Sequence, residues 1–196
     1  MKDHSSHIKN ILAESAALKS KLSADAGFVS LLSKIAGLVA DAFKSDKKVL
    51  FCGNGGSAAD AQHLAAELSG RFYTDREPLY AEALHVNTSY LTAVANDYSY
   101  DEVYSRLIVA KGRPGDVLFA ISTSGNSSNI IRAIDAARKK QMLVIGMTGE
   151  TGGKMVNLCD HIIRIPSKDT PRIQECHILA GHIICELVEM ELFPTA

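Results

Sequence analysis

The sequence predicts an α/β protein of the three-layer α/β/α type, in which helices cover both faces of a five-stranded parallel sheet. Two observations support this. After Lys48, five short apolar runs alternate with segments of helical periodicity, which is typical of βαβ units. The run "DVLFAIS" at 116–122 is apolar at nearly every position, as expected for a strand covered on both faces. At 196 residues, the chain suits one such domain.

Two long helices are expected before the first strand. Residues 5–24 carry apolar side chains close to a helical period with one face buried, and a second helix is expected from Phe28 to Phe43. An N-terminal pair of this kind packs on an α/β core or builds a subunit interface. We therefore expect residues 1–196 to form a single domain, to which residues 1–45 contribute these helices.

The remainder of the chain predicts strands and helices in alternation. Strands are expected at residues 49–52, 81–86, 116–122, 142–148 and 161–166. The last of them alternates apolar and polar side chains, which is typical of a strand at the sheet edge. Helices are expected from residue 57, at 89–97, at 129–140 and from about residue 171 to residue 192.

Composition argues against several functional classes. A net charge of −1 provides no basic stripe, so nucleic acid is not an expected partner. No apolar run approaches the roughly 20 residues that span a bilayer, and the N-terminus lacks the apolar core of a secretion signal, so neither a membrane partner nor export is expected. The cysteines form no C-x-x-C pair, and we expect them to be reduced in a cytoplasmic protein. They are Cys52, Cys159, Cys176 and Cys185.

A hydroxyl-rich turn, "STSGNSS" at 122–128, follows the third expected strand. Ligands of a parallel sheet bind beyond the carboxyl ends of its strands. Hydroxyls and free N–H groups at a helix N-terminus can hold a phosphate. Because no lysine accompanies the turn, a nucleoside-triphosphate loop is excluded and a monophosphate is the expected ligand. The alternative is an ordinary polar turn.

The turn after the first strand, at 53–58, loosely matches the dinucleotide-binding pattern G-x-G-x-x-A. Asn87, rather than Asp or Glu, follows the second strand, which argues against NAD and a nicotinamide-dependent dehydrogenase. Ser57 is expected to cap the next helix, with Asp60 completing a variant capping box. This capping role is compatible with ligand binding.

Two segments carry side chains suited to metal binding or acid–base catalysis. His63 and Glu67 lie four residues apart on one helix face, where the simpler alternative is a surface hydrogen bond. The last helix carries Gln174, His177 and His182, and periodicity does not decide which histidine joins the site. Two histidines, a glutamate and a glutamine suit a divalent metal such as zinc. The same residues suit a metal-free acid and base equally well.

Asp97 lies in "AVANDYSYDEVYSR", after the second strand and its helix. Its carboxylate has three candidate roles. It could bind a sugar hydroxyl, carry a proton or cap the following helix.

Four segments together resemble one known family. They are "CGNGGSAADAQHLAAEL", "AVANDYSYDEVYSR", "ISTSGNSSNIIRA" and "RIQECHILAGHIICELVE". In this order they are similar to the phosphoheptose isomerases (sedoheptulose 7-phosphate isomerases) of the sugar-isomerase (SIS) domain superfamily. The similarity covers essentially the whole chain, including the two leading helices, and so implies the SIS fold.

The resemblance implies that D-sedoheptulose 7-phosphate is converted through an enediol to D-glycero-D-manno-heptose 7-phosphate. This is the first committed step towards the ADP-heptose of the lipopolysaccharide core. It also implies a cytoplasmic homotetramer with one zinc ion per subunit. The implied zinc ligands are His63, Glu67, Gln174 and His182, which decides against His177. Glu67 is then the implied base and His182 the acid. Because a zinc-bound carboxylate is a weakened base, Asp97 is an alternative proton carrier.

The resemblance also implies the residues that contact the substrate. Those of the first turn are Asn54, Gly55, Gly56 and Ser57. Those of the hydroxyl-rich turn are Ser122, Thr123, Ser124 and Ser127. The others are Glu67, Asn96, Asp97 and Gln174.

Two other functions within the superfamily compete with this one. A non-catalytic SIS tetramer that binds the initiator of chromosome replication is also similar throughout. In that protein, however, the residue at the position of Glu67 is not acidic, and the residue at the position of His182 is not histidine. An isomerase of another sugar phosphate would share the serine-rich loop. The presence of both Glu67 and His182, together with the N-terminal helices, favours the heptose enzyme.

Overall fold

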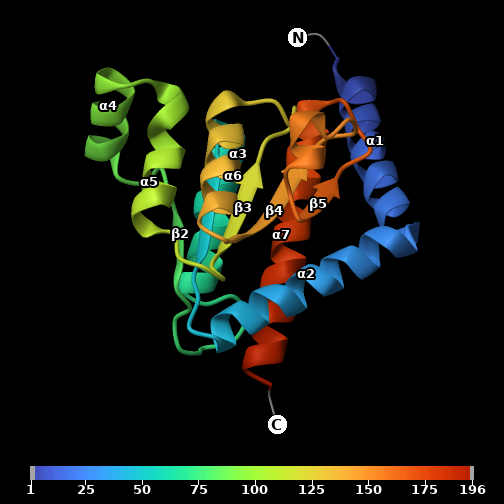
Figure 1. Ribbon diagram of the computed structural model, residues 1–196. Helices are drawn as coiled ribbons and strands as arrows, with labels where there is room; N and C mark the ends of the chain where they lie inside the picture. Colours follow the sequence, from blue (N-terminus) through green and yellow to red (C-terminus); the bar gives the residue numbers. More distant parts are fainter. Residues whose placement is uncertain (1–2, 195–196) are drawn as a thin grey trace.

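The computed structural model describes residues 3–194 and contains the expected five-stranded parallel sheet, in the order β2-β1-β3-β4-β5 (Figure 1). The strands are β1 (Val49–Gly53), β2 (Ala81–Ala83), β3 (Val117–Ile121), β4 (Leu143–Thr148) and β5 (His161–Arg164). The predicted edge position of the last strand is confirmed. The second strand is three residues long rather than six, because β2 pairs only with β1 and the chain turns away after Ala83.

Seven α-helices lie in the described residues. They are α1 (Ser5–Ala24), α2 (Ala26–Lys44), α3 (Gly56–Ser69), α4 (Thr88–Asp97), α5 (Val103–Lys111), α6 (Ser128–Lys139) and α7 (Thr170–Leu192). The sequence analysis missed α5 and two short 3₁₀ helices, Tyr100–Glu102 and Gly153–Asn157. A nine-residue helix is marginal by itself, and α5 is held by the burial of Val103, Tyr104 and Ile108.

Two hydrophobic clusters lie on opposite faces of the sheet, as the alternation of strand side chains requires. In β1, Val49 and Phe51 belong to one cluster, while Leu50 and Cys52 belong to the other. The first cluster is completed by α2, α3 and α7, and the second by α4, α5 and α6. The three-layer α/β/α prediction is therefore confirmed, and every strand residue of β1 and β3 is buried.

Helix α2 is long and apolar enough, by length and composition, to cross a membrane, which the sequence analysis did not anticipate. A core helix of a globular protein passes the same test. The side chains of Leu32, Ile35 and Val39 are buried in the first cluster. Asp25 begins the helix by accepting hydrogen bonds from the N–H groups of Gly27 and Phe28. This packing accounts for part of the apolar composition of α2, since 28% of its apolar stretch is buried.

The register of the sheet places two loops side by side. Gly53 at the end of β1 is level with Ile121 at the end of β3, and the two strands are hydrogen-bonded neighbours. The turn at 54–55 and the turn at 122–127 therefore leave the same edge of the sheet. Helices α3 and α6 begin directly after these turns.

Candidate active site

The first turn leads directly into α3. Gly55 has a φ of 55°, a left-handed conformation that favours glycine, and it precedes the helix without any side-chain capping bond. The prediction that Ser57 caps the helix, with Asp60 in a capping box, is wrong. The helix begins at Gly56, so Ser57 lies inside its first turn and is buried.

Gln174 reaches this turn from α7. A Cβ atom built on Gly56 would lie 2.4 Å from Nε2 of Gln174, so only glycine leaves room for the amide in its present position. The two residues are far apart in the sequence. The structure therefore places one predicted zinc ligand against the start of the helix that carries two others.

Asn54 joins the two turns. Its Nδ2 donates to Oδ1 of Asn129, and Nδ2 of Asn129 donates to Oδ1 of Asn54, both over 2.8 Å. The Tyr100 hydroxyl donates a longer bond of 3.3 Å to the same Asn54 oxygen. Sequence reasoning missed Asn129, whose signal was an amide within the apolar period of α6. Both polar atoms of the Asn54 side chain, Nδ2 and Oδ1, are therefore used to hold the two turns together.

The hydroxyl-rich turn brings its side chains together, as a phosphate site requires. The Ser122 hydroxyl is buried, 3.1 Å from the Ser127 hydroxyl and 3.4 Å from the Ser124 hydroxyl. Ser127 precedes α6 and makes no side-chain capping bond, so its hydroxyl does not occupy the N–H groups of the first helical turn. A pocket of about 290 Å³ lies beside Thr123 and Ser124. A larger hollow, about 660 Å³, lies between α5 and α6 and is lined by none of the predicted site residues.

Three of the predicted zinc ligands converge. Nε2 of His63 is 2.9 Å from Oε1 of Glu67 and 3.4 Å from Nε2 of His182. One ligand atom from each residue lies within 4.8 Å of the others. Burial lowers the pKa of His182, as does His63, while Glu67 acts in the opposite direction. Two imidazole nitrogens facing one carboxylate oxygen are a donor set that suits zinc.

Asp60 lies one turn before His63 on α3 and was not predicted as a site residue. Its Oδ2 atom is buried and has no hydrogen-bond partner within the described chain. Burial raises the pKa of its carboxyl to about 6, and His63 acts in the opposite direction. Its spacing of three residues from His63 and seven from Glu67 was the available signal. An unpaired carboxylate oxygen here fits a site that receives a cation or a sugar hydroxyl.

His177 does not join the cluster. Its side chain is fully buried, and Nε2 donates to the carbonyl of Thr148 at the end of β4 over 3.1 Å. Burial lowers its pKa to about 4. The geometry thus brings His182, and not His177, beside His63 and Glu67.

Asn96 and Asp97 are not brought to the cluster. Both are exposed at the end of α4, where Nδ2 of Asn96 donates to Oδ1 of Asp97 over 2.9 Å. In Figure 1, α4 lies at the left of the molecule, away from α7. Asp97 does not cap the next helix, because Ser99 and Glu102 hold the positions before the following helical segments.

Comparisons with known proteins identify the family of the chain. Residues 13–149 match the family model described as the SIS domain. The chain is 58% identical over 158 residues to the phosphoheptose isomerase of Rhodospirillum rubrum, which covers 81% of this chain and 84% of that relative. It is 49% identical over 187 residues to the phosphoheptose isomerase of Aneurinibacillus thermoaerophilus, which covers 95% and 94% of the two chains.

Solved structures extend the agreement to three dimensions. The phosphoheptose isomerase GmhA from Neisseria gonorrhoeae matches with a TM-score of 0.90 at 42% identity, over 95% of this chain and 99% of that one. The phosphoheptose isomerase from Francisella tularensis matches with a TM-score of 0.91 at 31% identity, over 96% and 100%. The chain therefore belongs to the phosphoheptose isomerase family of SIS-domain proteins.

Proposed function

We propose that this chain is a ketose–aldose isomerase that converts D-sedoheptulose 7-phosphate to D-glycero-D-manno-heptose 7-phosphate, the first step towards ADP-heptose for the lipopolysaccharide core. One observation carries the proposal. His63 and Glu67, which converge with His182, lie on α3, and the turn that begins this helix neighbours the turn of clustered serine hydroxyls, in a chain 49–58% identical to phosphoheptose isomerases. The presence of both Glu67 and His182 argues against a purely binding role.

The reaction requires a base and an acid at neighbouring carbons. A base removes a proton from C1, the hydroxymethyl carbon, while an acid protonates the carbonyl oxygen on C2, and an enediol results. Loss of the O1 proton and return of a proton to C2 then yield the aldose. We assign the base to Glu67 and the acid to His182. Asp97 is the alternative proton carrier, because metal binding would weaken Glu67 as a base, although within one chain Asp97 is not brought to the cluster.

The phosphate end of the substrate would bind at the hydroxyl-rich turn. Hydroxyl groups and the N–H groups of the α6 N-terminus can donate to the phosphate oxygens. The proposed donors are Ser122, Thr123, Ser124 and Ser127. Sugar contacts are proposed for Asn54, Gly55, Gly56, Ser57, Asn96, Asp97 and Gln174.

We propose one zinc ion per subunit, held by His63, Glu67, Gln174 and His182. The convergent donor atoms and the unpaired Asp60 oxygen support a cation at this place. When bound, zinc would stabilise negative charge on the two reacting oxygens. The chain's own residues would orient the sugar between the cluster and the serine turn.

We also propose that the whole chain acts as one domain within a cytoplasmic homotetramer. An apolar groove of about 400 Å³ between α1, α2 and α7 supports an interface between copies. It is lined by side chains such as Phe28, Val29, Leu179 and Ile183. Exposed Ile8 and Leu12 on α1 add to this apolar surface.

An isomerase assay tests the activity. Turnover of sedoheptulose 7-phosphate is measured on purified protein, after chelation and after restoration of zinc. Activity lost on chelation, restored by zinc and abolished in Glu67→Gln is the expected result. Glu14→Gln, which changes an exposed glutamate on α1, serves as the control. A folded wild-type protein without turnover would contradict the proposal and direct attention to other sugar phosphates or to initiator binding.

A further inference from the structure

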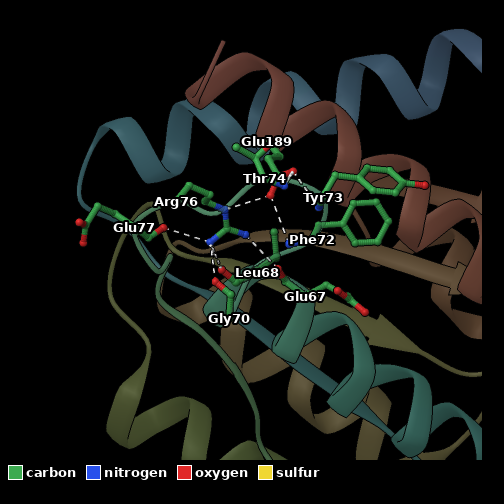
Figure 2. A network of polar contacts seen from close by, with 9 residues as sticks. All are labelled: Glu67, Leu68, Gly70, Phe72, Tyr73, Thr74, Arg76, Glu77 and Glu189. Atoms are coloured by element: carbon green, nitrogen blue, oxygen red, sulfur yellow. Dashed lines mark hydrogen bonds and ion pairs between the residues drawn. The ribbon is translucent and has the colours of Figure 1, made fainter. Parts of the chain in front are cut away.

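A buried ion pair lies at the carbonyl end of α3, the helix that carries His63 and Glu67, and joins two elements distant in sequence. Nε of Arg76 is 3.2 Å from Oε2 of Glu189, and the two side chains are 2% and 5% exposed. Arg76 belongs to the irregular segment between α3 and β2, and Glu189 lies near the end of α7. Figure 2 shows the guanidinium group between the Glu189 carboxylate and the carbonyl end of α3.

Arg76 holds the end of the helix that carries Glu67. Its Nη2 donates to the Glu67 carbonyl over 2.9 Å, and its Nη1 donates to the carbonyls of Leu68 at 2.8 Å and Gly70 at 3.1 Å. The last carbonyls of a helix have no partner within the helix, and a cation there is favourable. The backbone that bears the Glu67 side chain is thereby fixed by a residue nine positions away.

Glu189 holds the segment that follows this helix. Its carboxylate accepts hydrogen bonds from the N–H groups of Phe72 at 3.2 Å, Tyr73 at 2.9 Å and Thr74 at 2.7 Å. Burial by itself would raise the pKa of Glu189, but these N–H groups bring it below its ordinary value, so the carboxylate is charged. Three consecutive N–H groups aimed at one carboxylate fix the backbone of a segment without regular secondary structure.

The same segment packs against the ring of His182. The Phe72 ring centroid is 5.6 Å from that of His182, and the Tyr73 ring packs edge-on against Phe72. His182 and Glu189 are seven residues apart on α7, which places them on the same helix face. In Figure 2, the side chains of Phe72 and Glu67 extend to the same side of the network.

We propose that Arg76 and Glu189 are positioning residues for the isomerase reaction, and that their ion pair sets the distance between Glu67 on α3 and His182 on α7. This inference rests on the function proposed above. Neither residue touches the reacting atoms. A catalytic group displaced by about 1 Å costs on the order of 100-fold in rate, and loss of residues that orient metal ligands weakens metal affinity about 10- to 100-fold.

Conservative variants separate positioning from folding. Arg76→Lys keeps the charge next to Glu189, but a single ammonium cannot reach all of these carbonyls. Glu189→Gln keeps the shape and removes the charge. A doubly substituted chain, Arg76→Met with Glu189→Gln, leaves no buried charge, and the glutamine oxygen can still accept from the N–H groups of residues 72–74, so it provides a comparison if a single variant unfolds.

The chain offers a matched control in a second buried ion pair, which contacts none of the predicted site residues. Nζ of Lys48 is 2.6 Å from Oδ2 of Asp116, with side chains 14% and 2% exposed, and Asp116 also accepts from the N–H groups of Lys48 and Arg113. These residues precede β1 and β3, at the amino ends of the strands. Asp116→Asn therefore removes a comparable buried carboxylate whose partners are Lys48 and Arg113 rather than residues of the site.

The experiment measures kcat, KM, the unfolding temperature and zinc affinity, the last by competition with a chromogenic chelator on metal-stripped protein without substrate. We expect the Arg76 and Glu189 variants, folded at the assay temperature, to lose about 10- to 100-fold in both kcat and zinc affinity. Asp116→Asn should lower the unfolding temperature while keeping kcat and zinc affinity within twofold of wild type.

Two outcomes would overturn the inference. In one, folded Arg76 or Glu189 variants match wild type in kcat and zinc affinity. In the other, Asp116→Asn shows the same losses as they do. Absence of turnover in wild-type protein would instead contradict the proposed function. Zinc affinity would still report on the ion pair in that case.

Discussion

Asn54 and Asn129 exchange two amide hydrogen bonds of 2.8 Å between the start of α3 and the start of α6. They are 75 residues apart in sequence and connect the two turns that the proposed substrate would bridge. Because each amide is both donor and acceptor for the other, neither can be shortened without leaving a polar group unpaired. In the proposed site, these bonds would hold the sugar-binding turn at a fixed distance from the phosphate-binding turn.

Replacing Asn129 should therefore impair both stability and substrate binding. In Asn129→Ala, Nδ2 of Asn54 loses its partner and Oδ1 keeps only the longer bond from Tyr100, at a cost of about 1–3 kcal/mol. We expect a lower unfolding temperature and a raised KM. Thermal unfolding and steady-state kinetics measure the two effects, with exposed Asn157→Ala as the control. An unchanged KM in the Asn129 variant would mean that the turns are held by other contacts.

Gly56→Ala should act through Gln174. The added methyl group would lie 2.4 Å from Nε2 of Gln174, which must then move. The displaced group is the end of a flexible side chain, so we expect the protein to fold but to lose kcat/KM and zinc affinity. In a double-mutant cycle with Gln174→Ala, the glycine substitution should have little further effect. Additive losses in the cycle would show that the alanine acts elsewhere.

Ser122→Ala should weaken binding of the substrate phosphate. A hydrogen bond to a charged group contributes about 1.5–3 kcal/mol, so KM should rise roughly 10- to 100-fold with a smaller change in kcat. Inhibition by inorganic phosphate should weaken in parallel. Ser45→Ala, at an exposed position after α2, is the control. If KM stays at the wild-type value, the phosphate does not bind at this turn.

His177 should make the protein sensitive to mild acid. Its pKa is lowered to about 4 by burial, whereas the unfolded chain has a histidine pKa of about 6.5. Between these values the unfolded state binds the proton and the folded state does not. Its contribution to the free energy of unfolding is therefore lost as pH falls from 6.5 to 4, by about 3 kcal/mol.

The variant His177→Gln isolates this contribution. Its amide can still donate to the Thr148 carbonyl, but it does not titrate. Denaturant unfolding at a series of pH values should give a flatter pH dependence for the variant between pH 4 and 6.5. Equal slopes for the two proteins would assign the acid sensitivity to other groups.

The sequence predicted the sheet well because its strands are buried on both faces. β1, β3 and β4 appear as continuous apolar runs, and their ends were placed within one residue of those observed. The limits of α1 were predicted at Ser5 and Ala24, as observed. By contrast, α5 was missed because nine residues make too few helical turns for an apolar period to be recognised in the sequence alone.

The candidate site was less accessible from sequence alone. Spacing placed His63 and Glu67 on one helix face, but could not choose between His177 and His182, which depends on how α7 is rotated against α3. The Arg76–Glu189 pair spans 113 residues and has no local pattern at all. The cap assigned to Ser57 failed because a left-handed glycine begins the helix one residue earlier than a serine cap would.

Helix α7 carries polar side chains at several positions along its length. At about 1.5 Å per residue its 23 residues extend some 35 Å, and Gln174, His177, His182 and Glu189 each meet a different partner along that length. Such a helix can accept many substitutions but no change of length. Deleting one residue after Gln174 would turn all later contacts by about 100°, separating His182 from His63 and Glu189 from Arg76 in a single step. Insertions for tags or labels therefore do not belong in α7.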